Sequence, residues 1–379
     1  MQNKKRDLIL SLSFAAVIVA LLVVVDKTMH YSMLASVIQK AAIYSLLAVS
    51  LNLLNGFTGL FSLGQAGFML VGAYAYSILT IPVQHRASVY QYFDGGWIQF
   101  ALPSFVGIVV AGLVAVGFAW IVGKPCLKLK SDYLAIATLG FAEIIRAIIQ
   151  WEKLGPLTNA SNILKKFPKY DSILFPVIFA AVCIFLIILL INSSYGRAFK
   201  AIREDEIAAE AMGINLAKTK MQAFLTSAFF AGVGGALLAM FQASVQAKAF
   251  TSAMTYEILL VVVIGGIGSI TGSIIGSFLY IASSEWWLRF LDDANTYLGV
   301  DIPFMRGGFR MVVFSVVIMV IVLFYRKGIM GTKEFSWQGI INFFKKIFGK
   351  KSKKVVNSNE QSCASHGKYD HAVWRRRCC

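Results

Sequence analysis

The sequence predicts an all-α, polytopic membrane protein with about ten transmembrane helices. Of its 379 residues, 58% are hydrophobic and only 15% are charged, and the mean hydropathy is +0.69. Soluble domains carry about 25% charged residues, so this balance excludes an ordinary soluble domain. The apolar residues also fall in runs of about 20, which is the length that a helix needs to cross a bilayer.

Ten candidate spans follow from these runs, at residues 8–25, 34–54, 60–81, 98–122, 132–151, 172–191, 221–245, 256–268, 270–288 and 309–325. The first run has no small-residue cleavage site before Asp26, so we expect a retained span rather than a signal peptide. The run at 256–268 is short. Eight crossings plus a re-entrant hairpin over 256–288 is therefore an alternative.

Basic residues predict that both termini are cytoplasmic. With that orientation, the Lys and Arg residues of 124–130, 197–220 and 326–327 all fall inside the cell, as the positive-inside rule requires. The loop at 152–171 is the exception, because it is expected outside and carries four lysines. The predicted organisation is a span and outer loop at 1–33, a transmembrane domain at 34–330 with a cytoplasmic loop near 192–220, and a tail.

The tail supplies most of the positive charge. Residues 326–379 hold thirteen Lys or Arg and three Asp or Glu, a net of +10, which leaves +7 for the rest of the chain. Residues 337–348 have an apolar helical face with lysines at its margin, so the segment 331–354 is predicted to lie on anionic membrane lipid rather than on nucleic acid. Residues 355–379 are predicted to be disordered, and their Cys and His spacing fits no metal site.

Two segments share an unusual density of glycine, residues 55–72 (NGFTGLFSLGQAGFMLVG) and 265–276 (GGIGSITGSIIG). One interpretation is close packing of membrane helices through small residues. The other is a pair of broken helices that line a central pathway, since glycine-interrupted segments in two halves of a chain are typical of such pathways.

Polar residues at membrane depth complete the candidate pathway. The amides of Asn52, Asn55 and Gln65 suit a zwitterionic or amide ligand, although an interhelical hydrogen bond is the commoner role for each. Glu143 and Arg146 lie one helical turn apart and are expected to pair, in a structural role or on the pathway. The candidate pathway residues are Asn52, Asn55, Gly59, Gln65, Gly67, Glu143, Arg146, Gly266 and Gly268.

The chain lacks the motifs of an enzyme. It has no G-x-x-x-x-G-K-[ST] nucleotide loop and no H-E-x-x-H zinc motif, and no nucleophile, base and orienting residue are brought together. A stand-alone membrane enzyme is therefore not expected, and neither a catalytic residue nor a bound metal or cofactor is predicted.

A charged block at 196–213 (GRAFKAIREDEIAAEAMG) separates two long apolar runs. Charges in the bilayer centre cost about 3 kcal/mol each, so this block lies in water, on the cytoplasmic side by its basic residues. A small, Ala-rich helix there suits docking to a soluble partner. The alternative is a solvated connector that touches nothing.

Four stretches together resemble the LivM-type permease subunit of branched-chain amino-acid ABC importers. They lie at 47–76, 129–146, 196–239 and 263–279, and the resemblance covers roughly residues 34–330. It implies a multi-pass subunit of the bacterial plasma membrane that pairs with a LivH-like permease subunit. It also implies two cytoplasmic ABC ATPase subunits, which bind ATP and Mg, and an extracytoplasmic substrate-binding protein.

The resemblance also gives the charged block a role. ABC permeases carry a cytoplasmic coupling helix that docks on the ATPase, often with the pattern E-A-A-x-x-x-G. Here IAAEAMG matches it, with Ile207 in place of the Glu. The residues assigned to the coupling helix are Arg203, Glu204, Asp205, Glu206, Ala208, Ala209 and Gly213.

The implied function is ATP-driven import of branched-chain or related amino acids. Related permeases share these motifs, so import of urea or a short amide by the same kind of machine is an alternative. A different class is an ion-coupled secondary transporter that works alone, for which only Glu143 and Arg146 are candidates as an ion site.

Overall fold

The computed structural model describes residues 22–23, 26–27, 33–93, 96–129, 131–170, 172–287, 312–313, 315–316, 319, 328–331 and 334. These ranges contain helices and no β-strand, apart from one isolated antiparallel bridge between Leu164 and Val245. The predicted spans at 8–25 and 309–325, the amphipathic segment and the tail lie largely or wholly outside the described residues.

The long helices coincide with predicted spans. They are α2 (Met33–Asn52), α3 (Gln65–Thr80), α5 (Ser104–Cys126), α6 (Ser131–Gln150), α8 (Leu174–Asn192), α11 (Leu216–Gln242), α12 (Ser252–Gly265) and α13 (Ile270–Ala282). Short elements join them: η1 (Leu53–Phe57), α4 (Val83–Val89), η2 (Glu152–Leu154), α7 (Gly155–Thr158), α9 (Ser194–Glu204), α10 (Glu206–Ala211), η3 (Ala247–Ala249) and η4 (Ser283–Trp287).

Five of these helices are long and apolar enough to cross a membrane, namely α2 with η1, α5, α6, α8 and α11. The pair α12 and α13 passes the same test together, but its two parts are bent by 119° at a short break. The chain is therefore an all-α polytopic membrane protein. The predicted span at 60–81 begins too early, because residues 58–64 are not helical and α3 starts only at Gln65.

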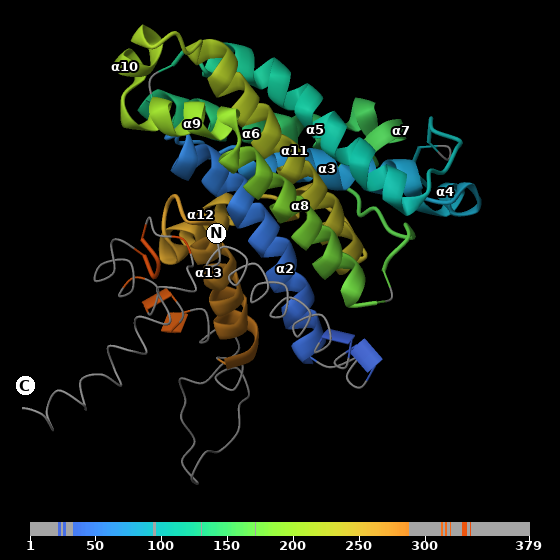
Figure 1. Cartoon of the computed structure of the whole chain (residues 1–379). Helices are drawn as coiled ribbons and strands as arrows, with labels where there is room; N and C mark the ends of the chain where they lie inside the picture. Colours follow the sequence, from blue (N-terminus) through green and yellow to red (C-terminus); the bar gives the residue numbers. More distant parts are fainter. Residues whose placement is uncertain are drawn as a thin grey trace, which may run out of the picture. The chain divides into compact units, whose positions relative to one another are not determined.

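The helices form an inner and an outer group (Figure 1). The most apolar windows of α2 and α11 are 72% and 78% buried within the chain, whereas those of α5, α6 and α8 are only 28% to 39% buried. α11 packs against α2, α3 and α5. The inner helices therefore carry the polar network described below, and the outer ones present apolar side chains such as Leu113 and Phe185.

Glycine brings α3 and α11 into close contact. A Cβ on Gly72 would lie 2.1 Å from the carbonyl oxygen of Gly232, and one on Gly235 would lie 2.1 Å from that of Met69. Only a residue without a side chain fits at such a crossing. The end of the first glycine-rich segment thus serves helix packing, while its beginning forms a break in the helix.

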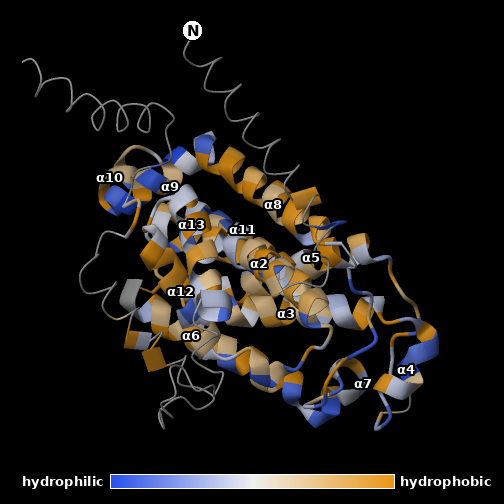
Figure 2. Ribbon diagram, turned by 90° about the horizontal axis from the view of Figure 1, so that it is seen from below, coloured by the Kyte–Doolittle hydropathy of each residue, from blue (hydrophilic) through white to orange (hydrophobic). Residues whose placement is uncertain are grey.

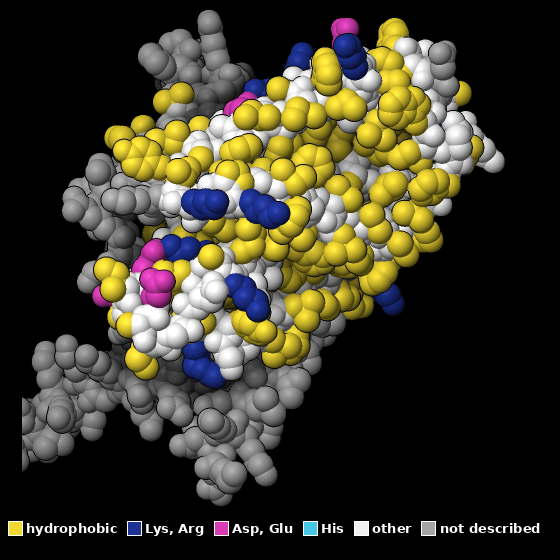
Figure 3. Space-filling model, turned by 90° about the horizontal axis from the view of Figure 1, so that it is seen from above, with side chains coloured by type: hydrophobic (Ala, Val, Ile, Leu, Met, Phe, Trp, Pro, Cys, Tyr) yellow, Lys and Arg dark blue, Asp and Glu magenta, His cyan; other side chains and the backbone are white. Residues whose placement is uncertain are grey.

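Polar residues concentrate at two ends of the helices. Figure 2 shows hydrophilic ribbon at α9 and α10 and again at α4 and α7, with apolar helices between them. In Figure 3, hydrophobic side chains cover most of the face, and the few charged ones lie mostly toward the side of α9 and α10. This distribution is expected of helices that cross a bilayer.

Candidate functional site

The charged block forms two short helices rather than one. α9 ends at Glu204, and Asp205 adopts an extended backbone that begins α10. Its carboxylate accepts hydrogen bonds from the backbone N–H groups of Ile207 (2.8 Å) and Ala208 (3.1 Å). Asp205 is therefore an N-cap, a role that its short acidic side chain favours. The cap fixes where α10 starts and separates it from α9.

The exposed face of α10 is more apolar than its sequence suggested. Ile207 is 81% exposed and Met212 is 83% exposed, whereas Ala209 is turned into the chain and buried. Glu206 accepts a hydrogen bond from Lys220 of α11 at 2.6 Å, which ties α10 to the next helix. This end of the chain therefore presents two large hydrophobic side chains at its surface.

Arg203 connects α9 to the first glycine-rich segment. Its Nη1 donates to the carbonyl oxygen of Gly56 at 3.0 Å, and its Nη2 pairs with Glu204 at 2.6 Å. Gly59 has a φ of +74° and lies against the same side chain, since a Cβ there would be 3.0 Å from Arg203 Cγ. The predicted coupling residue Arg203 and the predicted pathway residue Gly59 are thus in contact.

The two glycine-rich segments meet at Asn52, which is fully buried at the end of α2. Its Nδ2 donates to the carbonyl oxygen of Ser269 (2.9 Å) and to Ser273 Oγ (2.8 Å), and its Oδ1 accepts from the N–H of Gly268 (2.8 Å). Gly56 is also adjacent to Gly268. Asn52 has the interhelical hydrogen-bonding role that the sequence left open, and these bonds occupy its amide.

The break between α12 and α13 requires glycine. Gly266 and Gly268 have φ values of +120° and +87°, which side-chain-bearing residues rarely adopt. Residues 328–331 and 334 close the break: Ile329 N–H donates to Ile264 O at 2.8 Å, and a Glu334 carboxylate oxygen accepts from Ile270 N–H at 2.7 Å. The backbone groups left unpaired at the end of α12 and the start of α13 therefore find hydrogen-bond partners in Ile329 and Glu334.

The other predicted pathway residues near α3 are held by the chain itself. Gln65 is buried, and its amide donates to Ser50 Oγ at 2.7 Å. Asn55 is half-buried and accepts from Ser62 N–H at 3.1 Å, which holds the non-helical stretch 58–64. Gly67 packs on α6, where a Cβ would meet Ala142 at 2.9 Å.

Glu143 and Arg146 pair within α6, as their spacing predicted. Arg146 Nε donates to Glu143 Oε2 at 2.7 Å, and the other carboxylate oxygen accepts from Ser252 Oγ of α12 at 2.8 Å. Both side chains are about one-third exposed. The pair joins α6 to the start of α12. No cluster of possible metal ligands occurs among the described residues.

A second charged group was not predicted. Lys40 of α2 forms an ion pair with Glu285 of η4, and its ammonium lies 5.8 Å from the ring centre of Tyr44. Glu257 of α12 is within hydrogen-bonding reach of Tyr44. The available signal was Lys40 itself, which is the only charged residue in the run 34–54.

The end with α4 and α7 is capped by a buried arginine. Arg86 donates to the carbonyl oxygens of Ile78 (3.0 Å), Phe100 (2.7 Å) and Ile98. Burial raises the pKa of the neighbouring Tyr90 to about 12, although the charge of Arg86 opposes the shift. Tyr90 therefore keeps its proton at neutral pH. These bonds hold α4 against the end of α3 and against residues 98–100.

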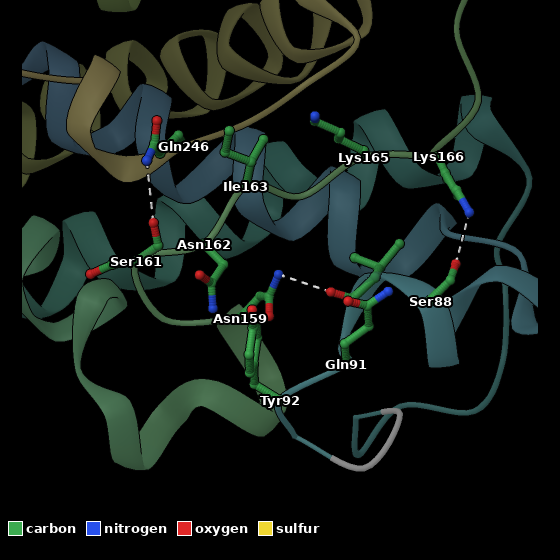
Figure 4. A pocket seen from close by; sticks show the side chains of 11 residues that line it. Ser88, Gln91, Tyr92, Asn159, Ser161, Asn162, Ile163, Lys165, Lys166 and Gln246 are labelled. Carbon is green, nitrogen blue, oxygen red and sulfur yellow. Dashed lines mark hydrogen bonds between the residues drawn. The ribbon is translucent and has the colours of Figure 1, made fainter.

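A polar hollow of about 460 Å³ opens at the same end. Figure 4 shows Gln246 donating to Ser161, Asn159 to the Val89 carbonyl and Lys166 to Ser88. The hollow is built from residues 159–166, the end of α4 and the α11–α12 connection. Two of the four lysines that fit the positive-inside rule poorly, Lys165 and Lys166, thus line this hollow.

Comparison with known proteins identifies relatives over most of the chain. Residues 33–324 match the family described as branched-chain amino acid transport system / permease component. The chain is 32% identical over 289 residues to the high-affinity branched-chain amino acid transport system permease protein LivM of Escherichia coli K12, which covers 68% of this chain and 64% of that protein. The LivM protein of Salmonella typhimurium gives the same identity and coverage.

Permease proteins named LivH are also similar to this chain. LivH of Escherichia coli K12 is 25% identical over 261 residues, which covers 62% of this chain and 79% of that protein. The chain spans about 64% of the length of the LivM relatives that it matches. Among solved structures, no significant match was found.

Proposed function

We propose that this chain, which belongs to the permease-component family of branched-chain amino acid transport systems, is a transmembrane subunit of an ABC importer. It would move branched-chain or related amino acids across the bacterial plasma membrane. The observation that carries this proposal is the α9–α10 loop, a capped pair of helices with an exposed apolar face.

The partners follow from the two ends of the molecule. The α9–α10 end faces the cytoplasm and docks on an ABC ATPase, which binds ATP and Mg. The α4–α7 end faces outward, and its lysine-rimmed hollow receives an extracytoplasmic substrate-binding protein. A LivH-like subunit completes the pathway, in keeping with the similarity of this chain to both LivM and LivH proteins.

Direct contacts between residues carry the motion of the ATPases to the transmembrane helices. Movement of the ATPases displaces α10 and α9, and Arg203 transfers the displacement to the Gly56 carbonyl. Gly56 is four residues from Asn52, whose side chain holds the break between α12 and α13. The α9–α10 loop can thereby shift the contact between α2 and α13. Each hydrogen bond on this route contributes only modestly by itself.

Reconstitution tests the proposal directly. The chain would be purified with its LivH-like, ATPase and binding-protein partners and placed in proteoliposomes with radiolabelled leucine. We expect uptake that requires ATP and all partners. Uptake by this chain alone, without nucleotide, would contradict the proposal and would favour an ion-coupled transporter.

A further inference from the structure

Charged side chains from three elements gather beside α2. Lys40 of α2 pairs with Glu285 of η4, and Tyr44 lies one turn farther along α2. Glu257 of α12 reaches Tyr44. We call Lys40, Glu257 and Glu285 the mid-membrane charge cluster. Glu257 also interacts with the charge of Lys40, although among the described residues no basic side chain lies within ion-pair distance of Glu257.

The cluster lies at membrane depth. The span formed by α2 and η1 runs from Met33 to Phe57, so Tyr44 is near its middle and Lys40 one turn closer to its start. α13 runs antiparallel to α2, because Asn52 bonds to Ser273 near one end while Lys40 pairs with Glu285 near the other. Lys40 therefore stands inside the apolar span of α2, and Glu285 lies beside it.

The exposure of these charges excludes a lipid-facing position. The side chains of Lys40 and Glu285 are 26% and 40% exposed, and Glu257 is exposed. Ionised groups inside a bilayer are costly and face protein or a water-filled cavity. The outer helices differ, since they expose residues such as Leu113 and Phe185, which suit lipid. The face of α2, α12 and η4 is therefore expected to border protein or water rather than lipid.

We propose that the mid-membrane charge cluster binds the charged ends of an α-amino acid as it passes through the pathway. Lys40 accepts the α-carboxylate in exchange for Glu285, and Glu257 receives the α-ammonium. The inference rests on the proposed function and names the residues that would hold its amino-acid substrate. A zwitterion needs both signs of charge, whereas urea or another neutral amide needs neither.

A purely structural ion pair is the competing explanation. If Lys40 and Glu285 serve only to join α2 to η4, then reversing them as Lys40→Glu with Glu285→Lys restores the pair and restores transport. If they bind the substrate, the reversed pair turns the zwitterion around, so that its side chain points the wrong way. The double variant then assembles but does not transport.

The test uses the complete importer in proteoliposomes with its binding protein, ATP and radiolabelled leucine. Glu257→Gln and Lys40→Met are each expected to lower the initial uptake rate about ten- to hundred-fold, because a hydrogen-bonded charge is lost. Lys128→Gln, an exposed change just after α5 that removes one charge outside the α9–α10 loop, the α4–α7 end and the charge cluster, is the matched control and should transport normally. Assembly is checked by co-purification of the ATPase.

The outcomes separate this inference from the proposed function. If the unmodified complex takes up no amino acid, the proposed function fails first. If the unmodified complex transports leucine and Glu257→Gln or the reversed pair transports equally well, only the inference is overturned. If a single variant fails to assemble, the reversed pair decides, because rescue of uptake supports the structural explanation and assembly without uptake supports substrate binding.

Discussion

The contact around Asn52 and the surface of α10 both hold polar residues, but they use them in opposite ways. Asn52 is fully buried, and each of its amide atoms is bonded to the break between α12 and α13. On α10, Asp205 bonds to its own helix and leaves Ile207 and Met212 exposed. Satisfied polar groups fix the contact at Asn52, whereas α10 leaves two apolar side chains exposed for the docking proposed above.

Asn52→Leu should give the largest effect. Leucine has a similar size but removes the bonds to Ser269, Ser273 and Gly268, and it leaves a buried N–H without an acceptor. We expect a loss of about 2–4 kcal/mol in the stability of the purified complex. Thermal unfolding in detergent measures it.

Asn55→Leu is the matched control, since Asn55 is half-buried and bonds only to Ser62. It should lower leucine uptake but leave the complex assembled. Equal melting temperatures for the two leucine variants would refute the structural role given to Asn52. Unchanged uptake kinetics would remove Asn55 from the pathway.

Ile207→Glu should be next in effect. A new charge on one of the two highly exposed apolar residues at α10 opposes burial against a partner, so we expect co-purification of the ATPase to fall about tenfold or more. Ile163→Glu makes the same change at the opposite end of the molecule and should leave co-purification unchanged. A loss of ATPase from both variants would mean that the effect is not specific to α10.

Arg203→Met should uncouple transport while the ATPase remains bound. The change cuts the hydrogen bond to the Gly56 carbonyl and leaves the exposed face of α10 in place. We expect stimulation of ATP hydrolysis by the loaded binding protein to fall several-fold, with the basal rate retained. Arg197→Met on the same helix, where the arginine bonds to Ser194, should behave as the unmodified complex does. Identical stimulation in the two variants would sink the transmission route through Arg203.

Gly213→Ala should have the smallest effect. Gly213 has a φ of +85°, so alanine is strained by about 1 kcal/mol, but nothing lies within 4 Å of the added carbon. We expect a slight loss of stability and transport within about twofold of normal. Gly117→Ala, in open space without a positive φ, should be neutral. A severe defect in Gly213→Ala would indicate a close partner contact at this position.

The sequence predicted the helices better than their contacts. Apolar runs located the long helices, and three-residue spacing predicted the pair of Glu143 and Arg146. The stop of α2 before the stretch 58–64 depends on bonds such as that between Asn55 and Ser62, which hydropathy does not register. The break of α9 at Asp205 is a capping effect within a continuous charged block.

Long-range partners could not be predicted from local pattern. Asn52 was recognised as a polar residue at depth, but its bonds to Gly268 and Ser273 join residues more than 200 positions apart. Lys40 was overlooked because one lysine barely alters the hydropathy of a long apolar run. Its importance emerges only when α13 brings Glu285 beside it.

Cysteine cross-linking tests the central claim most directly, because it asks which end of the chain touches the ATPase. The native cysteines would be replaced by serine, and Ile207→Cys or Lys166→Cys introduced into the complete importer, with single cysteines along the groove of the ATPase. Our account predicts rapid cross-links from position 207 that change with nucleotide, and none from position 166. Cross-links to the ATPase from position 166 but not from position 207 would contradict it.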